Sequence, residues 1–132
     1  MNTATVDVLV VDDEEDVRAS VADVLRSAGF TVEEAEDGLV ALALLERLTV
    51  GAMVLDLSMP RCDGVEVIDR LASPPPILIV SARQVSDVDR IRVEPKITAY
   101  LKKPVSPARL IEQVRAAIDR GGPHEAGRRT PD

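Results

Sequence analysis

Short apolar runs alternate with segments of helical periodicity five times along the chain, and this alternation restricts the fold more than any other feature. The apolar runs indicate strands, and the segments between them carry apolar residues three and four positions apart, as amphipathic helices do. Strict alternation of strand and helix predicts a parallel sheet with helices on both faces, and so an α/β protein. The expected strands cover residues 8–11, 30–36, 52–56, 77–82 and 97–101, and the expected helices cover residues 17–28, 39–48, 65–71, 85–91 and 110–118.

The composition of the five strands indicates their order in the sheet. The strands at 8–11, 52–56 and 77–82 are apolar throughout, as strands covered on both faces are. Glutamates in the second strand, and Lys102 and Lys103 at the end of the fifth, indicate two edge strands. We therefore predict a flavodoxin-like, doubly wound (βα)5 fold with the strand order 2-1-3-4-5. In this order ligands bind beyond the carboxyl ends of the first and third strands, where the chain reverses direction.

Length and composition indicate one domain. The 132 residues suit a single domain, assigned to residues 1–120, and the aperiodic residues 121–132 indicate a flexible tail or a truncated linker. The net charge of −7 argues against direct binding of nucleic acid, because phosphate contacts need clustered lysine and arginine. The first residues do not resemble a signal segment, no apolar run approaches 18 residues, and the single Cys62 excludes an internal disulfide. A cytoplasmic protein without membrane contacts is expected.

Acidic residues stand at the carboxyl ends of the first and third strands. Five consecutive acids begin at Asp12, and Asp56 ends the third strand. Because these strand ends are neighbours in the predicted sheet, Asp12, Asp13 and Asp56 should meet in one crevice. At about 5 Å and an effective dielectric constant near 20, each like-charged pair costs roughly 3 kcal/mol, so the cluster needs a cation. Oxygen ligands without histidine or cysteine nearby indicate a hard divalent ion, Mg²⁺ or alternatively Mn²⁺.

Acids after a strand have a second interpretation, because the macrodipole of a following helix favours negative charge in its first turn. We assign this role to the acids at 14–16, which are expected to face solvent. For Asp12 and Asp13 alone the two interpretations are evenly balanced. Asp56 favours the metal site, since it ends an apolar strand and no helix is expected to begin until about residue 64.

Two further polar residues end the remaining strands. Ser81 lies at the end of the fourth strand, and Lys103 follows the fifth. A residue directly before proline is held extended, so Lys103 can project over the sheet edge toward the acids. Serines and lysines at strand ends are mostly solvated, but together with the acids they suit a phosphoryl group held by metal, ammonium and hydroxyl. One carboxylate then remains free to act as the nucleophile.

Five segments stand out as motifs: VVDDEEDVR, AEDGLVAL, VLDLSMPRCDGVEVI, ILIVSA and YLKKPVS. In their order and spacing, over about residues 6–119, they resemble the receiver domain of bacterial two-component response regulators. The segment around Asp56, with its Met-Pro and Asp-Gly pairs, is the most specific part when combined with Lys103-Pro104. The resemblance implies a phosphorylation-dependent signalling switch rather than an enzyme, a domain that promotes its own phosphorylation and dephosphorylation.

The resemblance also implies roles for the matching residues. Asp56 would accept a phosphoryl group from the phosphohistidine of a cognate histidine kinase or phosphotransfer protein. Asp13 and Asp56 would bind Mg²⁺ directly, with the backbone carbonyl of Ser58 as a third ligand and Asp12 acting mostly through water. Lys103 would pair with the phosphoryl oxygens.

A conformational response is implied as well. Ser81 would swing toward the phosphoryl group, and Tyr100 would turn inward and reshape the face formed by the fourth helix, fifth strand and fifth helix. That face would bind a downstream protein partner or a fused output domain, or would pair two copies of the chain. Ser58 and Arg83 resemble positions that tune hydrolysis of the phosphoryl group, and the alternative is that they are plain loop residues.

Two features near the fifth strand concern the backbone. The resemblance implies a cis peptide bond between Lys103 and Pro104. The segment IRVEPKITAY departs from the small residues that the family usually has before this strand. We expect residues 94–96 to shorten the fourth helix or to alter its end, which bears on the output face and not on the phosphorylation pocket.

Other functions fit the sequence less well. A metal-dependent phosphatase with an aspartyl nucleophile usually has a second aspartate two residues after the first, where this chain has Ser58. A nucleotide-binding protein would have a glycine-rich loop after the first strand, where the acids of this chain would repel phosphates. A degenerate receiver that only binds proteins is disfavoured by the intact Asp13, Asp56, Ser81 and Lys103. The chain is either a stand-alone receiver or one domain of a longer protein.

Overall fold

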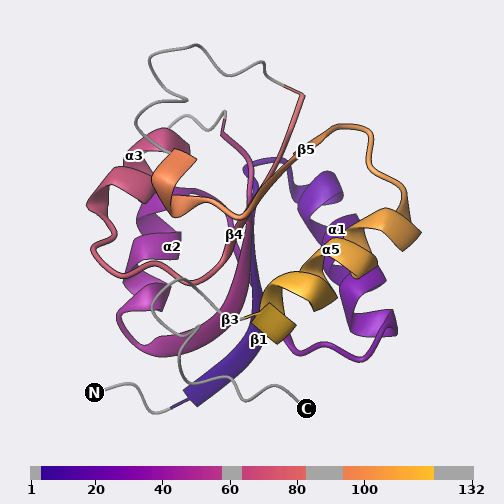
Figure 1. Cartoon of the computed structure of the whole chain (residues 1–132), viewed down its shortest axis with the longest axis horizontal. Helices are drawn as coiled ribbons and strands as arrows, with labels where there is room; N and C mark the ends of the chain where they lie inside the picture. The colour runs from indigo at the N-terminus through magenta and orange to yellow at the C-terminus, as the bar shows by residue number, and fades with distance from the viewer. Residues whose placement is uncertain (1–3, 58–63, 83–93, 121–132) are drawn as a thin grey trace.

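The computed structural model describes residues 4–57, 64–82 and 94–120, and in these ranges the chain forms one sheet flanked by helices (Figure 1). The five strands of this sheet are parallel and follow the order β2-β1-β3-β4-β5, so the predicted α/β fold and strand order are confirmed. The described elements are β1 (Ala4–Val11), α1 (Glu15–Ser27), β2 (Val32–Ala35), α2 (Gly38–Leu45), β3 (Leu48–Leu55), α3 (Gly64–Arg70), β4 (Ile77–Ser81), the 3-10 turn η1 (Glu94–Lys96), β5 (Ala99–Lys102) and α5 (Pro107–Arg120).

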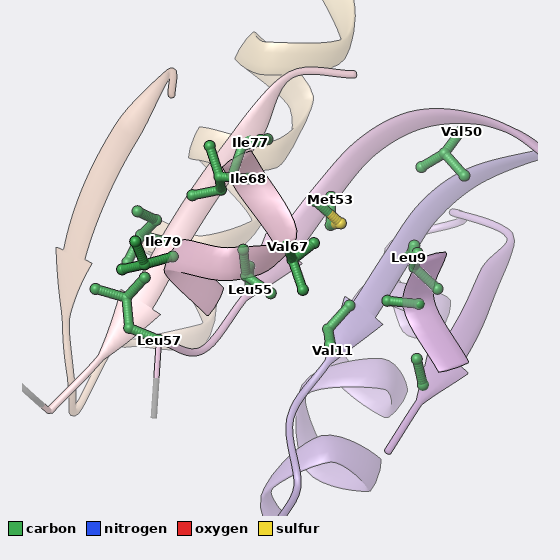
Figure 2. Packing of buried hydrophobic residues seen from close by; sticks show 13 residues of the cluster. Leu9, Val11, Val50, Met53, Leu55, Leu57, Val67, Ile68, Ile77 and Ile79 are labelled. Carbon is green, nitrogen blue, oxygen red and sulfur yellow. The ribbon is translucent and has the colours of Figure 1, made fainter. Parts of the chain in front are cut away.

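The sheet separates two apolar cores. Side chains of successive strand residues point to opposite faces, so alternate residues of one strand belong to different cores. Leu9 and Val11 pack on the side covered by α2 and α3, whereas Val8 and Val10 pack on the side covered by α1 and α5 (Figure 1). Figure 2 shows the first core, to which α3 contributes Ile68. Burial on both faces explains why β1 and β3 are apolar over their second halves and β4 is apolar over its first four residues.

The boundary between α2 and β3 differs from the prediction. The helix expected over 39–48 ends at Leu45, and β3 already begins at Leu48. The strand is longer than expected because residues 48–50 pair with residues 4–6 of β1, which also begins earlier than predicted. The β-branched Thr-Val pair in this segment favours strand over helix once a partner strand lies beside it.

Several other boundaries differ from the prediction by two or three residues. β2 and β5 each begin two residues later than predicted. The helix expected over residues 85–91 lies outside the described residues. Among the helices that the structure describes, none combines the length and the apolar character needed to cross a membrane.

The start of α3 lies directly on the backbone that follows β3. The amide of Gly64 donates to the carbonyl oxygen of Leu57 at 3.0 Å. A Cβ at Gly64 would lie 2.7 Å from the carbonyl oxygen of Asp56 and 2.7 Å from the Cα of Leu57, a separation that side chains do not adopt. Glycine at this position therefore lets the helix pack closely against the strand end that carries Asp56.

Candidate functional site

Three carboxylates meet at the carboxyl end of the sheet. Asp12 and Asp13 follow β1 directly, and Asp56 follows β3 directly. The two strands are adjacent and in register, with Val11 opposite Leu55, and the Asp56 amide donates to the Val11 carbonyl at 3.1 Å. Each of the three aspartates presents one carboxylate oxygen that lies within 4.8 Å of the others. The convergence expected from the strand order is therefore present in the structure.

Asp12 is held at four of its atoms, and it is 4 % exposed. Its amide donates to the carbonyl of Ala35 at 3.2 Å, which continues the pairing of β1 with β2. Its Oδ1 accepts from the amide of Glu14 at 3.0 Å, and its Oδ2 accepts from Nζ of Lys103 at 3.0 Å. Its carbonyl oxygen accepts from Nη1 of Arg18 at 3.0 Å. Both carboxylate oxygens of Asp12 thus already have a donor.

Lys103 supplies the positive charge of the site. Its amide donates to the carbonyl of Ser81 at 3.2 Å, and its bond to Pro104 is cis. Its Nζ lies 3.0 Å from Oδ2 of Asp12 and 3.5 Å from Oδ2 of Asp56. Burial lowers the pKa of Lys103, but the hydrogen bond with Asp12 and the charges of Asp56 and Asp12 outweigh burial and raise this pKa above its ordinary value. The lysine is therefore an ammonium ion at neutral pH.

The charges of the site do not balance among the described residues. One ammonium faces three carboxylates, and of these Asp13 is exposed whereas Asp12 and Asp56 are buried. The acids at 14–16 are exposed, as expected, and stay outside this cluster. Carboxylate oxygens without sulfur or imidazole are the donors that hard divalent cations prefer. The donor set is therefore compatible with Mg²⁺.

Ser81 and Tyr100 lie on the two strands nearest to Lys103. Ser81 is the last residue of β4, is buried, and stands opposite Lys102 of β5. Tyr100 stands opposite Ile79, packs against the core that faces α2 and α3, and has a buried hydroxyl oxygen. Two further residues assigned to the site from the sequence, Ser58 and Arg83, lie outside the described residues.

Residues 8–115 match the family model of the response regulator receiver domain. The chain belongs to this family. Its curated relatives include response regulator MprA of Mycobacterium sp. (strain KMS), which is 38% identical over 121 residues that make up 89% of this chain and 53% of the relative. The transcriptional regulatory protein PrrA of Mycobacterium leprae is 41% identical over 119 residues, which make up 87% of this chain and 51% of the relative. The receiver domain thus spans about half the length of the curated relatives that it matches.

Solved receiver domains have the same fold. The receiver domain of the Francisella response regulator 1452 superposes with a TM-score of 0.78 at 27% identity, covering 87% of this chain and 98% of that chain. The chemotaxis protein CheY4 of Vibrio cholerae gives a TM-score of 0.73 at 27% identity, with 87% and 98% covered. Receiver domains are signalling modules of two-component systems rather than enzymes in the usual sense.

Two basic residues of this receiver domain had no predicted role. Arg18 of α1 reaches back to the Asp12 carbonyl, and its signal in the sequence is that it is the only basic residue between Asp12 and Leu25. Lys96 of η1 donates from Nζ to the carbonyls of Ile68 and Leu71, at 3.1 and 2.8 Å, where α3 ends. The unusual segment 94–96 therefore fastens the approach to β5 onto α3.

Proposed function

We propose that this receiver domain is a phosphorylation-dependent switch of a two-component system or phosphorelay in the cytoplasm, with Asp56 as its phosphoacceptor. The donor would be a phosphohistidine on a cognate histidine kinase or phosphotransfer protein. The observation that carries the proposal is the convergence of Asp56 with two other aspartates and Lys103, which come from three different strand ends. Membership in the receiver family supports the same function.

Asp56 is the best nucleophile among the three carboxylates. Both carboxylate oxygens of Asp12 accept hydrogen bonds, and Asp13 is exposed at the rim. Asp56 follows the central strand β3, so Asp12 on one side and Ser81 on the other flank it. In the transfer, a carboxylate oxygen of Asp56 forms a bond to phosphorus while the phosphorus–nitrogen bond to histidine breaks. The electron pair of that bond returns to the imidazole, and Asp56 becomes an acyl phosphate.

The carboxylates would hold Mg²⁺ for this reaction, with Mn²⁺ as a substitute. Asp13 and Asp56 are the proposed direct ligands, together with the carbonyl of Ser58. Asp12 would act through water, in keeping with the hydrogen bonds that its oxygens already accept. When bound, the cation neutralises negative charge on the phosphoryl oxygens and on the carboxylates.

Lys103 and Ser81 would bind the transferred group, and Tyr100 would respond to it. The ammonium of Lys103 lies 3.5 Å from Asp56 and can pair with a phosphoryl oxygen there without a large movement. The hydroxyl of Ser81 would donate a hydrogen bond to the same group. Tyr100 would turn inward in the resulting population shift, which would reshape the face formed by the fourth helix, β5 and α5.

A downstream protein partner or an output domain would bind the changed surface. We propose residues 1–120 as the receiver domain and residues 121–132 as a tail or linker. Pairing of two phosphorylated copies through the fourth helix, β5 and α5 is a further element of the proposal.

Ser58 and Arg83 are the proposed positions that tune hydrolysis of the acyl phosphate.

Phosphorylation with acetyl phosphate and Mg²⁺ tests the proposal. The wild-type chain should gain one phosphoryl group, seen as a shift on a phosphate-affinity gel, and EDTA should prevent it. Asp56→Asn should abolish the shift, whereas the matched Asp16→Asn should preserve it because Asp16 is exposed and outside the cluster. An unchanged shift in Asp56→Asn would refute the assignment of the phosphoacceptor.

A further inference from the structure

Arg18 joins the acidic site to the edge of the sheet. It belongs to α1, yet its Nη1 donates to the backbone carbonyl of Asp12 at 3.0 Å. Its Nε donates to Oε1 of Glu34 in β2 at 3.2 Å, and its side chain is 15% exposed. One planar guanidinium thus contacts the backbone between β1 and α1 with one nitrogen and the edge strand β2 with another.

Glu34 in turn is fixed by a second arginine. Its Oε2 accepts from Nη1 of Arg26 at 3.2 Å, and Nη2 of Arg26 donates to the carbonyl of Val32 at 2.9 Å. The carboxylate of Glu34 therefore has a separate donor on each oxygen, and the bond from Arg26 fixes its orientation toward Arg18. The Arg26 side chain is 45% exposed, more than that of Arg18, and the hydrogen bonds that it donates go to residues of β2.

The carbonyl that Arg18 contacts lies in the segment that carries two of the three clustered acids. Asp13 follows this carbonyl directly, and the carboxylate of Asp12 is held by the amide of Glu14 and by Lys103. A backbone rotation at this peptide unit would move Asp12 and Asp13 together relative to Asp56. Arg18 restrains that rotation because two different nitrogens of one planar guanidinium contact the Asp12 carbonyl and Glu34, a geometry that the single nitrogen of a lysine does not reproduce.

We propose that Arg18 is a positioning residue that fixes the carboxylates of Asp12 and Asp13 for cation binding beside Asp56. Its role in phosphoryl transfer rests on the function proposed above. Removal of a positive charge near three carboxylates would by itself strengthen cation binding. A charge-conserving substitution separates the two effects, because Arg18→Lys keeps the charge and loses the planar guanidinium that contacts its partners with two nitrogens.

Arg26→Lys is a matched control. Arg26 also bonds a carboxylate oxygen of Glu34 and a backbone carbonyl. That carbonyl belongs to Val32 of β2, so the same chemical change is made away from the three clustered aspartates. Mg²⁺ affinity would be measured by titration calorimetry for both variants and the wild-type chain, and urea midpoints would report on folding. Loss of an outer partner of metal ligands commonly weakens binding 10- to 100-fold, so we expect about tenfold weaker binding for Arg18→Lys. Arg26→Lys should stay within about twofold of wild type.

A metal-free measurement separates failure of this role from failure of the proposed function. The Glu14 amide bonds to the Asp12 carboxylate, so its hydrogen exchange in EDTA reports on that carboxylate directly. It should exchange faster in Arg18→Lys than in Arg26→Lys, and Glu34→Gln, a milder change, should lie between them. Equal exchange, or equal Mg²⁺ affinities in the two lysine variants, would overturn the role of Arg18. A wild-type chain that neither binds Mg²⁺ nor is phosphorylated would instead overturn the proposed function.

Discussion

Replacement of Lys103 by methionine should make the stability of this domain depend strongly on a divalent cation. The ammonium lies 3.0 Å from Asp12 and 3.5 Å from Asp56, and both of these carboxylates are buried. Lys103→Met keeps the aliphatic stem and removes the charge. The variant then holds three carboxylates near one another with no lysine between them, and we expect its metal-free form to be markedly destabilised.

The size of the effect follows from the geometry. The clustered carboxylate oxygens lie within 4.8 Å of one another, and two like charges at that limiting distance repel by about 3.5 kcal/mol at an effective dielectric constant of about 20. Removing one partner of a fully buried ion pair costs roughly 3–5 kcal/mol. Because the Lys103 side chain is 21% exposed and water screens part of its charge, we expect about 2.5 kcal/mol. With a urea m-value of about 1.5–2 kcal/mol/M, the unfolding midpoint should fall by about 1.5 M.

The assay is urea unfolding at neutral pH, in EDTA and again with saturating Mg²⁺. The net charge of the variant site is one unit more negative, so the site should bind the cation more tightly, and mass action should then offset most of the loss of stability. The control is Lys102→Met, since Lys102 is exposed and its replacement should change stability by less than about 0.5 kcal/mol. Equal losses for Lys103→Met in EDTA and in Mg²⁺ would refute the electrostatic reasoning.

Three further outcomes are expected. Lys96→Met removes a charged donor from the carbonyls of Ile68 and Leu71 at the end of α3, and should cost about 2 kcal/mol in urea unfolding; a loss below about 0.5 kcal/mol would contradict this. Gly64→Ala forces the backbone beside Asp56 apart, and should cost about 2 kcal/mol and slow phosphorylation by acetyl phosphate; an unaltered rate would count against it. Because folding raises the pKa of Lys103, its contribution is fully present below the unfolded value of 10.5 and is lost as pH rises through the folded pKa. In EDTA, the difference in unfolding free energy between wild type and Lys103→Met should therefore narrow only above about pH 10.5. A difference that already narrows near pH 8 would disprove this role of the Lys103 charge.

The strand order and the meeting of the acids could be predicted because both depend on residue types at strand ends. Charged residues in the second and fifth strands indicated the edges, and the switch point followed from the order. Parallel strands in register then bring Asp12 and Asp56 together whatever the loops between them do. The boundary at Leu48 could not be predicted in this way. The helical pattern of α2 continues in the sequence up to Leu48, and only pairing with β1 makes the segment from Leu48 a strand.

The contacts of Arg18 and Lys96 could not be predicted for a different reason. Both side chains donate to backbone carbonyls, of Asp12 in one case and of Ile68 and Leu71 in the other. Every residue has a carbonyl, so an acceptor of this kind leaves no mark on the sequence. Only the three-dimensional path of the chain identifies which carbonyl a long basic side chain can reach.

The lysine that faces the clustered acids lies 91 residues beyond Asp12 in the chain. During synthesis the ribosome releases Asp12, Asp13 and Asp56 well before β5, which is an outer strand and joins the sheet at its edge. A nascent chain can therefore assemble β1 and β3 while their acids still lack the ammonium of Lys103. Until the last strand docks, cations from the surrounding solution can take the place of that ammonium.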